Sequence, residues 1–253
     1  MATSKGMRFA GALVAVLLLG SAGSASAAVK MKDGHPDLSG FWGVKFERKP
    51  TGQALIDELP KGTIMIKDTG PGELKEGDFG GLTLTPRALA QVKKYSYADD
   101  TSVTNNCKSP TMAFLMQAPF PMEIHQGKDM IILKMEYFDM VRIVYMDRSK
   151  HTPPDAPHSK AGDSIGHWEG DTLVIDTDHL EPGTMMNNGF DHTEDMHVIE
   201  KLRLSPDGKT LWMTQLYNDP GTFKGTAARY LSWSKKPGEY VYPYDCDPNY
   251  LKE

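Results

Sequence analysis

Residues 163–177 read DSIGHWEGDTLVIDT and decide the fold class. Strand-like residues run up to Glu169 and resume directly after Asp171, so the stretch predicts a tight β-hairpin. Glycine in such a turn supplies positive φ, and aspartate caps backbone amides. Because side chains alternate along a strand, His167 and Trp168 face opposite ways. Trp168 is the better core residue, so we expect His167 to point outward unless a ligand cavity at this end reverses the two.

The same pattern of short strand-like runs between turn signals continues through the second half of the chain. Asp207-Gly208 is a two-residue hairpin signal, and glycine-containing turns occur at 127–129 and 237–238. Regular short strands without intervening helices predict an all-β fold, an antiparallel barrel of about eight to ten strands. We favour a barrel because closure removes strand edges that this sequence does little to protect. The predicted strands are MEIHQ, DMIILKMEY, MVRIVYMD, SIGHW, TLVIDT, MHVIEKLRL, TLWMTQLYN, ARYLSWS and YVYPY.

Residues 1–27 have the three regions of a secretory signal peptide. Lys5 and Arg8 form a positive start, residues 9–20 are apolar, and an A-x-A cleavage motif ends at Ala27. The apolar run is shorter than the ~20 residues that span a bilayer. We therefore expect cleavage near Ala27 and a periplasmic or secreted protein without membrane insertion.

The mature chain is predicted to form one domain. Residues 28–121 are rich in glycine, proline and charge, and we expect them to wrap the barrel and to add one or two strands. This segment also contains the best helix candidate, Thr85 to Tyr95, with Thr85 as N-cap and Pro86 at the first helical position. Residues 122–253 form the main antiparallel barrel.

Charge and cysteine content narrow the function classes. The formal net charge is −5 and no block of lysine and arginine occurs, which argues against nucleic acid or an anionic membrane surface as a partner. Cys107 and Cys246 would lie in an oxidising compartment, so one disulfide is the simplest interpretation, and it explains both residues at once. A catalytic thiol would explain only one of them.

Two charged residues interrupt the apolar pattern of neighbouring strands. Glu136 follows MIILKM, and Arg142 lies on the same predicted strand face as Met140 and Val144. One interpretation is a solvated Glu136 and an Arg142 that buries only its stem. The other is a polar patch inside the barrel, where Arg142 holds an anionic or carbonyl oxygen and Glu136 acts as a base.

His192 is the most promising candidate acid or base. It lies in a polar stretch, NNGFDHTEDMHVIE, with Asp191 beside it, and a neighbouring carboxylate raises the pKa of an imidazole. The alternative is a surface histidine without a role. His167 is a further catalytic candidate, and the predicted ligand-binding residues are Tyr145, Asp147, Trp168 and Asp219.

Eight histidines and fifteen methionines make a metal site worth weighing. No HxH, HExxH or CxxC spacing occurs, and the glycine motifs of phosphate and dinucleotide sites are absent. Methionine beside histidine suits copper, although methionine more often fills a core. We predict no metal ligands and no cofactor, and keep a copper or zinc site as a second alternative.

PDLSGFW, VRIVYMD, GDSIGHWEGDTLVIDT, HTEDMHVIEKLRL and the NDPGTF turn together resemble a family of secreted bacterial proteins with a GxSIGxWEGDTLVVDT signature. The resemblance extends from about residue 36 to 249. It implies export and a calycin-like β-barrel, and it implies no particular activity. The family usually reads Asp-Gly-Arg after the IVY strand, whereas this chain has Asp147-Arg148-Ser149.

Three functions fit this sequence. We favour a cofactor-independent lyase, hydratase or isomerase that acts on a small apolar or aromatic molecule inside the barrel. His192 and Glu136 would then transfer protons while Arg142 stabilises an oxyanion. The alternatives are a lipocalin-like carrier and a structural protein with a filled barrel. A cavity with converging titratable groups favours the enzyme, whereas an apolar cavity favours the carrier. The oligomeric state does not follow from this sequence.

Overall fold

The computed structural model describes Met1 and residues 28–67, 77–95, 107–186 and 189–247. The predicted signal peptide lies outside these residues except for Met1. The strands are β1 (Gly40–Val44), β2 (Ile64–Met65), β3 (Met122–Gln126), β4 (Met130–Met135), β5 (Val141–Tyr145), β6 (Asp163–Glu169), β7 (Thr172–Asp178), β8 (Gly183–Met186), β9 (Phe190–His192), β10 (His197–Leu204), β11 (Thr210–Asn218) and β12 (Thr226–Lys235).

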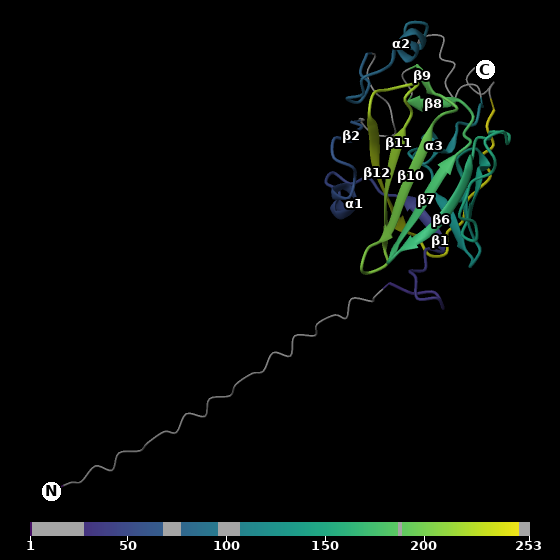
Figure 1. Cartoon of the computed structure of the whole chain (residues 1–253). Helices are drawn as coiled ribbons and strands as arrows, with labels where there is room; N and C mark the ends of the chain where they lie inside the picture. The colour runs from purple at the N-terminus through teal and green to yellow at the C-terminus, as the bar shows by residue number, and fades with distance from the viewer. Residues whose placement is uncertain (2–27, 68–76, 96–106, 187–188, 248–253) are drawn as a thin grey trace.

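Among these described residues, nine strands close into a barrel, which confirms the all-β prediction (Figure 1). The order around the wall is β1, β3, β4, β5, β6, β7, β10, β11 and β12, and β12 pairs back to β1. The short strand β2 adds to the other end of β12, and β8 and β9 form a separate hairpin at the top of the barrel in this view.

Residues 163–177 form the predicted hairpin. β6 and β7 are antiparallel, with Glu169 opposite Thr172, and the turn residue Gly170 has a φ of +62°. Trp168 stacks on the ring of His35, with 4.7 Å between the ring centroids. The side chain of His167 is 62% exposed, so the tryptophan packs and the histidine faces solvent.

The barrel is not antiparallel throughout, which corrects the prediction at one position in its wall. β5 and β6 run parallel, with Val144 opposite Ser164. The physical reason is the connection between them, because the loop of residues 146–162 returns along the barrel before β6 begins. Arg148 fixes the end of this loop through two hydrogen bonds to Asp163, at 2.9 and 2.8 Å.

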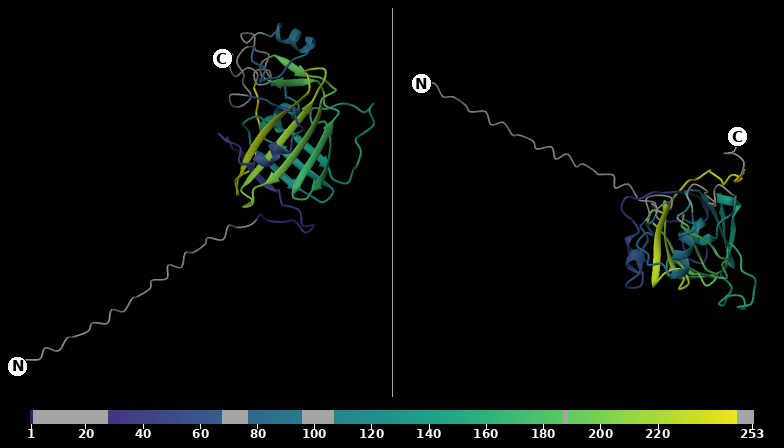
Figure 2. Two further views of the ribbon diagram at one scale, coloured as in Figure 1. Left: turned by 60° about the vertical axis from the view of Figure 1, so that its left-hand side comes forward. Right: turned by 90° about the horizontal axis from the view of Figure 1, so that it is seen from above.

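The N-terminal segment supplies part of the barrel as well as its surroundings. β1 stands in the wall between β3 and β12. The predicted helix is present as α2 (Pro86–Val92), with the Thr85 hydroxyl accepting from the amide of Ala88. Two shorter helices, α1 (Gln53–Asp57) and α3 (Met112–Leu115), were not predicted because they are too short to show a helical period. α1 lies outside the wall against β11, and α2 contacts β9 (Figure 2).

The predicted last strand, YVYPY, is not a strand. Pro243 lacks the amide that a ladder requires, and Tyr240 and Tyr242 are exposed. This tail instead crosses the outside of the barrel, where the amide of Tyr242 donates to Glu136 at 3.0 Å. The predicted disulfide between Cys107 and Cys246 is confirmed.

Buried apolar side chains form one core cluster within the barrel. It includes Trp42, Leu133, Ile175, Leu202 and Met213, none of which is more than 1% exposed. Among the residues described, no helix is long and apolar enough to cross a membrane.

Candidate functional site

A row of polar side chains crosses the barrel interior within this core, because Glu200 lies opposite Ile175 and Arg142 lies opposite Leu133. Glu200 of β10 lies opposite Gln215 of β11, and Gln215 lies opposite Arg229 of β12. All three positions alternate with outward-facing residues, so the register of three neighbouring strands aligns them. Each is at most 2% exposed, and Nε2 of Gln215 donates to Oε1 of Glu200 at 2.8 Å.

Arg142 of β5 joins this row from a strand three positions away around the wall. Its Nη2 lies 2.5 Å from Oε2 of Glu200, and the same nitrogen donates to the hydroxyl of Thr177 at 2.7 Å. Its Nε donates to the hydroxyl of Ser164 at 3.0 Å. Because the residue is only 1% exposed, the interpretation of Arg142 as a snorkelling side chain is wrong. Its guanidinium lies inside the barrel.

Tyr217 continues the row toward β12. Its hydroxyl donates to Oε1 of Gln215 at 2.7 Å, and Nη1 of Arg229 lies 3.3 Å from the same hydroxyl. Nη2 of Arg229 also lies 3.3 Å from the carbonyl of Met185. We call the connected set Arg142, Glu200, Gln215, Tyr217 and Arg229 the interior polar chain.

The interior polar chain ends at a cavity of about 480 Å³, which we call the side pocket. β12 leaves room for it by changing partners along its length. Trp233 pairs with Val44 of β1, whereas Ala228 pairs with Met65 of β2, and residues 229–232 between them line the pocket. The apolar part of the wall includes Val44, Phe46, Ile66, Met116, Leu231 and Trp233.

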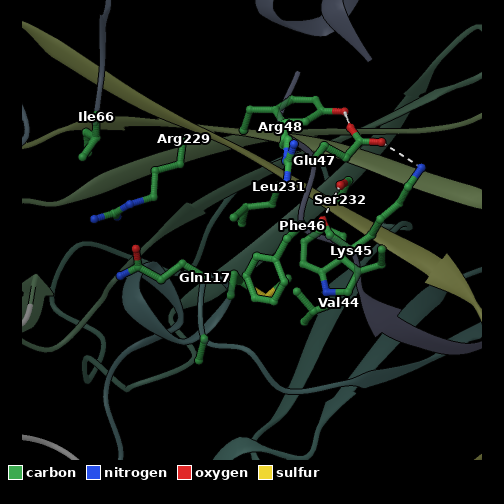
Figure 3. A pocket seen from close by; sticks show the side chains of 14 residues that line it. Val44, Lys45, Phe46, Glu47, Arg48, Ile66, Gln117, Arg229, Leu231 and Ser232 are labelled. Atoms are coloured by element: carbon green, nitrogen blue, oxygen red, sulfur yellow. Dashed lines mark hydrogen bonds and ion pairs between the residues drawn. The ribbon is translucent and has the colours of Figure 1, made fainter. Parts of the chain in front are cut away.

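Polar groups occupy two sides of the side pocket. Gln117 and Arg229 extend toward the side of Ile66, whereas Lys45 and Glu47 lie on the opposite side (Figure 3). Gln117 is 6% exposed, and among the described residues neither atom of its amide has a hydrogen-bond partner. The same holds for the indole nitrogen of Trp233, which is 1% exposed.

The carboxylate of Glu47, which lines the side pocket, is held by three neighbouring side chains. It accepts hydrogen bonds from the hydroxyls of Tyr230 and Thr51, at 2.8 and 2.6 Å, and pairs with Lys45 at 2.8 Å. Although burial acts to raise the pKa of Glu47, the hydrogen bonds from Lys45, Thr51 and Tyr230 lower it to about 2. Burial and the Glu47 carboxylate raise the pKa of Tyr230 to about 12. Neither group changes its charge near neutral pH.

His192 lies at the top of the barrel in β9, away from the interior polar chain. Its Nδ1 donates to the carbonyl of Thr193 at 2.9 Å, so Nε2 is free to accept from the hydroxyl of Thr111 at 2.6 Å. The residue is fully buried, and burial lowers the pKa of His192. The imidazole is therefore neutral, and it links β9 to the residue before α3.

The structure does not bring the three main catalytic candidates together. Arg142 is inside the barrel and His192 is in the β8–β9 hairpin, whereas Glu136 lies at the outer end of β4 against the C-terminal tail. The fourth candidate, His167, is exposed on β6, 3.5 Å from Glu169. Proton transfer between these residues and one substrate is incompatible with this arrangement.

The predicted ligand-binding residues are also dispersed. Tyr145 lies under the guanidinium of Arg148 at 4.6 Å, and Asp147 is exposed in the following loop. Trp168 packs near the β6–β7 turn, and the buried Asp219 accepts from the amide and hydroxyl of Thr193. None of the four lines the side pocket.

Sequence reasoning missed Gln117 and Arg229, for different reasons. Arg229 shows the same pattern as Arg142. It is a charged residue on the strand face that it shares with Ala227, Leu231 and Trp233, which are apolar. Gln117 follows a four-residue helix, whose length is too short for a periodic pattern to distinguish its faces.

A cluster of His151, Asp163 and Asp178 has the atom spacing of a metal site. Its carboxylates, however, already have partners. Arg148 and the amide of Thr152 donate to Asp163, at 2.8 and 2.7 Å to the same oxygen. His151 lies 3.0 Å from Asp178. These contacts explain the cluster as the attachment of the loop of residues 146–162 to the barrel wall.

A scan against protein-family models and a search of curated proteins each found no match for this chain. The barrel, the interior polar chain and the side pocket are the observations from which we infer function.

Proposed function

We propose that the mature protein is an exported binding barrel that holds a small, largely apolar molecule in the side pocket. The observation that carries the proposal is the pocket itself. Its volume of about 480 Å³ falls within the ~300–1,000 Å³ of small-molecule sites. Its walls combine apolar side chains with a few polar groups, which is the usual composition of such sites.

The pocket fits binding better than the acid–base catalysis favoured by the sequence. A general acid or base works best with a pKa near the working pH. The pKa values of Glu47 and Tyr230, about 2 and about 12, lie far from neutrality. His192, the base inferred from the sequence, is buried elsewhere with both ring nitrogens hydrogen bonded. A lipocalin-like carrier is therefore our proposal.

Export is part of the same proposal and rests on two observations. The first 27 residues have the charge and hydropathy pattern of a cleaved signal peptide. The disulfide between Cys107 and Cys246 is of a kind that persists in oxidising compartments. The resemblance to secreted bacterial proteins with a calycin-like barrel supports the periplasm or the exterior as the location.

The test fills the pocket without touching the rest of the barrel. Leu231→Trp adds an indole to the pocket wall, and Leu89→Trp makes the same change at an exposed position on α2. We expect the wild type and Leu89→Trp to bind the fluorescent apolar anion 1-anilinonaphthalene-8-sulfonate at one site, and Leu231→Trp to lose this binding. Unchanged binding by a folded Leu231→Trp protein, checked by circular dichroism, would refute the proposal.

A further inference from the structure

The lining of the side pocket is positively charged, although the chain as a whole is acidic. Among the described residues that line it, Lys45, Arg48 and Arg229 are basic and Glu47 is the only acidic one. Because Glu47 has a pKa of about 2, it is ionised at neutral pH, and the lining has a formal charge of +2. The whole chain has a formal charge of −5. A cleft with apolar walls focuses such a field, so the side pocket favours anions.

The carboxylate of Glu47 is already occupied by the protein itself. Its Oε1 accepts from the hydroxyl of Thr51 at 2.6 Å and lies 2.8 Å from Nζ of Lys45. Its Oε2 accepts from the amide of Thr51 at 3.0 Å and from the hydroxyl of Tyr230 at 2.8 Å. The side chain of Glu47 is only 6% exposed. A carboxylate accepts about four hydrogen bonds, so Glu47 has no capacity left for a cationic ligand.

The guanidinium of Arg48 differs from the other cations of the lining because it is accessible. Arg48 is exposed, and no carboxylate among the described residues pairs with it, whereas Lys45 is engaged by Glu47 and by Thr210. A guanidinium offers a planar fork of donors that matches two oxygens of one anion. An anion bound at this exposed residue keeps part of its hydration, so the desolvation cost of burying a charge is largely avoided.

The apolar residues of the side pocket lie deeper than Arg48. Met116 and Trp233 are 2% and 1% exposed, whereas Arg48 is exposed. Figure 3 shows the basic side chains spread across the lining, with the side chain of Leu231 among them. An anion with an apolar body can therefore place the body against Met116 and Leu231 and its charged group at Arg48. Burial of the body supplies most of the binding free energy, and the polar contact fixes the orientation.

We infer that the side pocket binds an amphipathic anion, a molecule with an apolar or aromatic body and one anionic oxygen group, and that Arg48 binds this group at the edge of the pocket. The inference rests on the proposed binding function and names the chemical class of its ligand. Arg48 is then the residue that distinguishes an anionic ligand from a neutral molecule with the same body.

The test compares two fluorescent probes with the same aromatic body. 1-Anilinonaphthalene-8-sulfonate has a sulfonate group, and N-phenyl-1-naphthylamine is its neutral counterpart without that group. Both are titrated into the mature protein at about 0.15 M salt, where charges more than about 8 Å apart are largely screened. We expect Arg48→Gln to weaken binding of the sulfonate probe by about 1.5- to 5-fold, the range for one exposed ion pair. Binding of the neutral probe should not change.

A graded change of charge makes the test sharper. Arg48→Glu replaces attraction by repulsion, so it should weaken binding of the sulfonate probe more than Arg48→Gln does. The matched controls are Lys49→Gln and Lys49→Glu, which make the same type of charge change at the next residue, an exposed lysine outside the pocket lining. We expect the Lys49 variants to bind both probes as the wild type does. Thermal melts monitored by circular dichroism check that all four variants fold.

The wild-type protein provides a second measurement that needs no substitution. Raising the salt concentration from about 0.05 to 0.5 M shortens the distance over which charges interact. We expect this change to weaken binding of the sulfonate probe and to leave binding of the neutral probe unweakened. If salt does not weaken binding of the sulfonate probe, the inference is overturned, whether or not the Arg48 variants fold.

The outcomes separate this inference from the proposed function. Folded Arg48 variants that bind the sulfonate probe as the wild type does overturn the inference. An equal loss of both probes in these variants, or an equal effect of the Lys49 variants, also overturns it. If only the neutral probe binds the wild type and Leu231→Trp blocks that binding, the proposed function holds and the anionic ligand is wrong. If neither probe binds the wild type, the proposed function fails, and this inference fails with it.

Discussion

Arg142→Met should be among the most damaging substitutions in the barrel. Arg142 is 1% exposed and donates to Glu200, Ser164 and Thr177. Its removal leaves the buried carboxylate of Glu200 with the hydrogen bond from Gln215. Removing one partner of a buried ion pair typically costs about 3–5 kcal/mol. We therefore expect the free energy of unfolding at neutral pH to fall by that amount.

The double variant Arg142→Met/Glu200→Leu distinguishes the energetic contribution of the Arg142–Glu200 ion pair from that of the surrounding packing. It removes both charges, and replacing a buried pair by apolar residues is often close to neutral. The remaining cost is the amide of Gln215, which loses its acceptor, at about 1–3 kcal/mol. We therefore expect the double variant to be more stable than Arg142→Met alone.

Urea unfolding of the mature protein, followed by near-ultraviolet circular dichroism, measures both effects. Lys134→Met on the outer face of β4 is the matched control, and we expect it to change the free energy of unfolding by no more than about 0.5 kcal/mol. The reasoning is refuted if the loss of unfolding free energy in the double variant equals the sum of the losses measured for Arg142→Met alone and Glu200→Leu alone. That result would mean that Arg142 and Glu200 do not stabilise one another.

Three further predictions follow from contacts elsewhere in the barrel. Replacing Cys107 and Cys246 together by alanine should lower the free energy of unfolding by about 5 kcal/mol, because the disulfide spans 139 residues, and a urea midpoint unaffected by reductant would contradict this. Gly166→Ala should cost about 1–3 kcal/mol in thermal melts, because its Cβ would lie 2.7 Å from Met146 Sδ, and an unchanged melting temperature would be evidence against that packing. The hydrogen bond to Asp178 raises the pKa of His179, so its stabilising effect is complete below the ordinary value near 6.5 and is lost as the pH rises through the folded value. The stability difference between wild type and His179→Asn should therefore shrink above pH 6.5, and urea titrations that show it growing would be inconsistent with this sign.

Features encoded within a few residues were predictable from the sequence. The hairpin of residues 163–177 follows from alternation and one glycine turn, and α2 follows from its N-cap Thr85 and Pro86. The disulfide follows from having only two cysteines in a chain whose first 27 residues have the sequence pattern predicted for an export signal. The hairpin and α2 depend only on neighbouring residues, and two cysteines can pair in only one way, so none of these predictions required the order of the strands.

The site depends on strand order and register, which alternation does not provide. Alternation marked Arg142 as unusual, but its partner Glu200 lies three strands away around the wall. The parallel pairing of β5 and β6 brings Arg142 beside Ser164, and a sequence of turns predicts antiparallel neighbours instead. The polar residues beside His192 suggested an exposed loop, yet the imidazole is buried against Thr111.

The pairing of β1 with β12 also sets the order in which this protein can fold. Trp42 and its neighbours come early in the chain, and the strand that completes their sheet comes near its end. Under the proposed export, the chain would cross the membrane from its N-terminus, so β1 would emerge long before β12 is available to cover its edge. Contacts between such distant segments form slowly because a long loop must close first. Under the same proposal, barrel closure would follow translocation, and until closure β1 would be an open edge that other chains can reach.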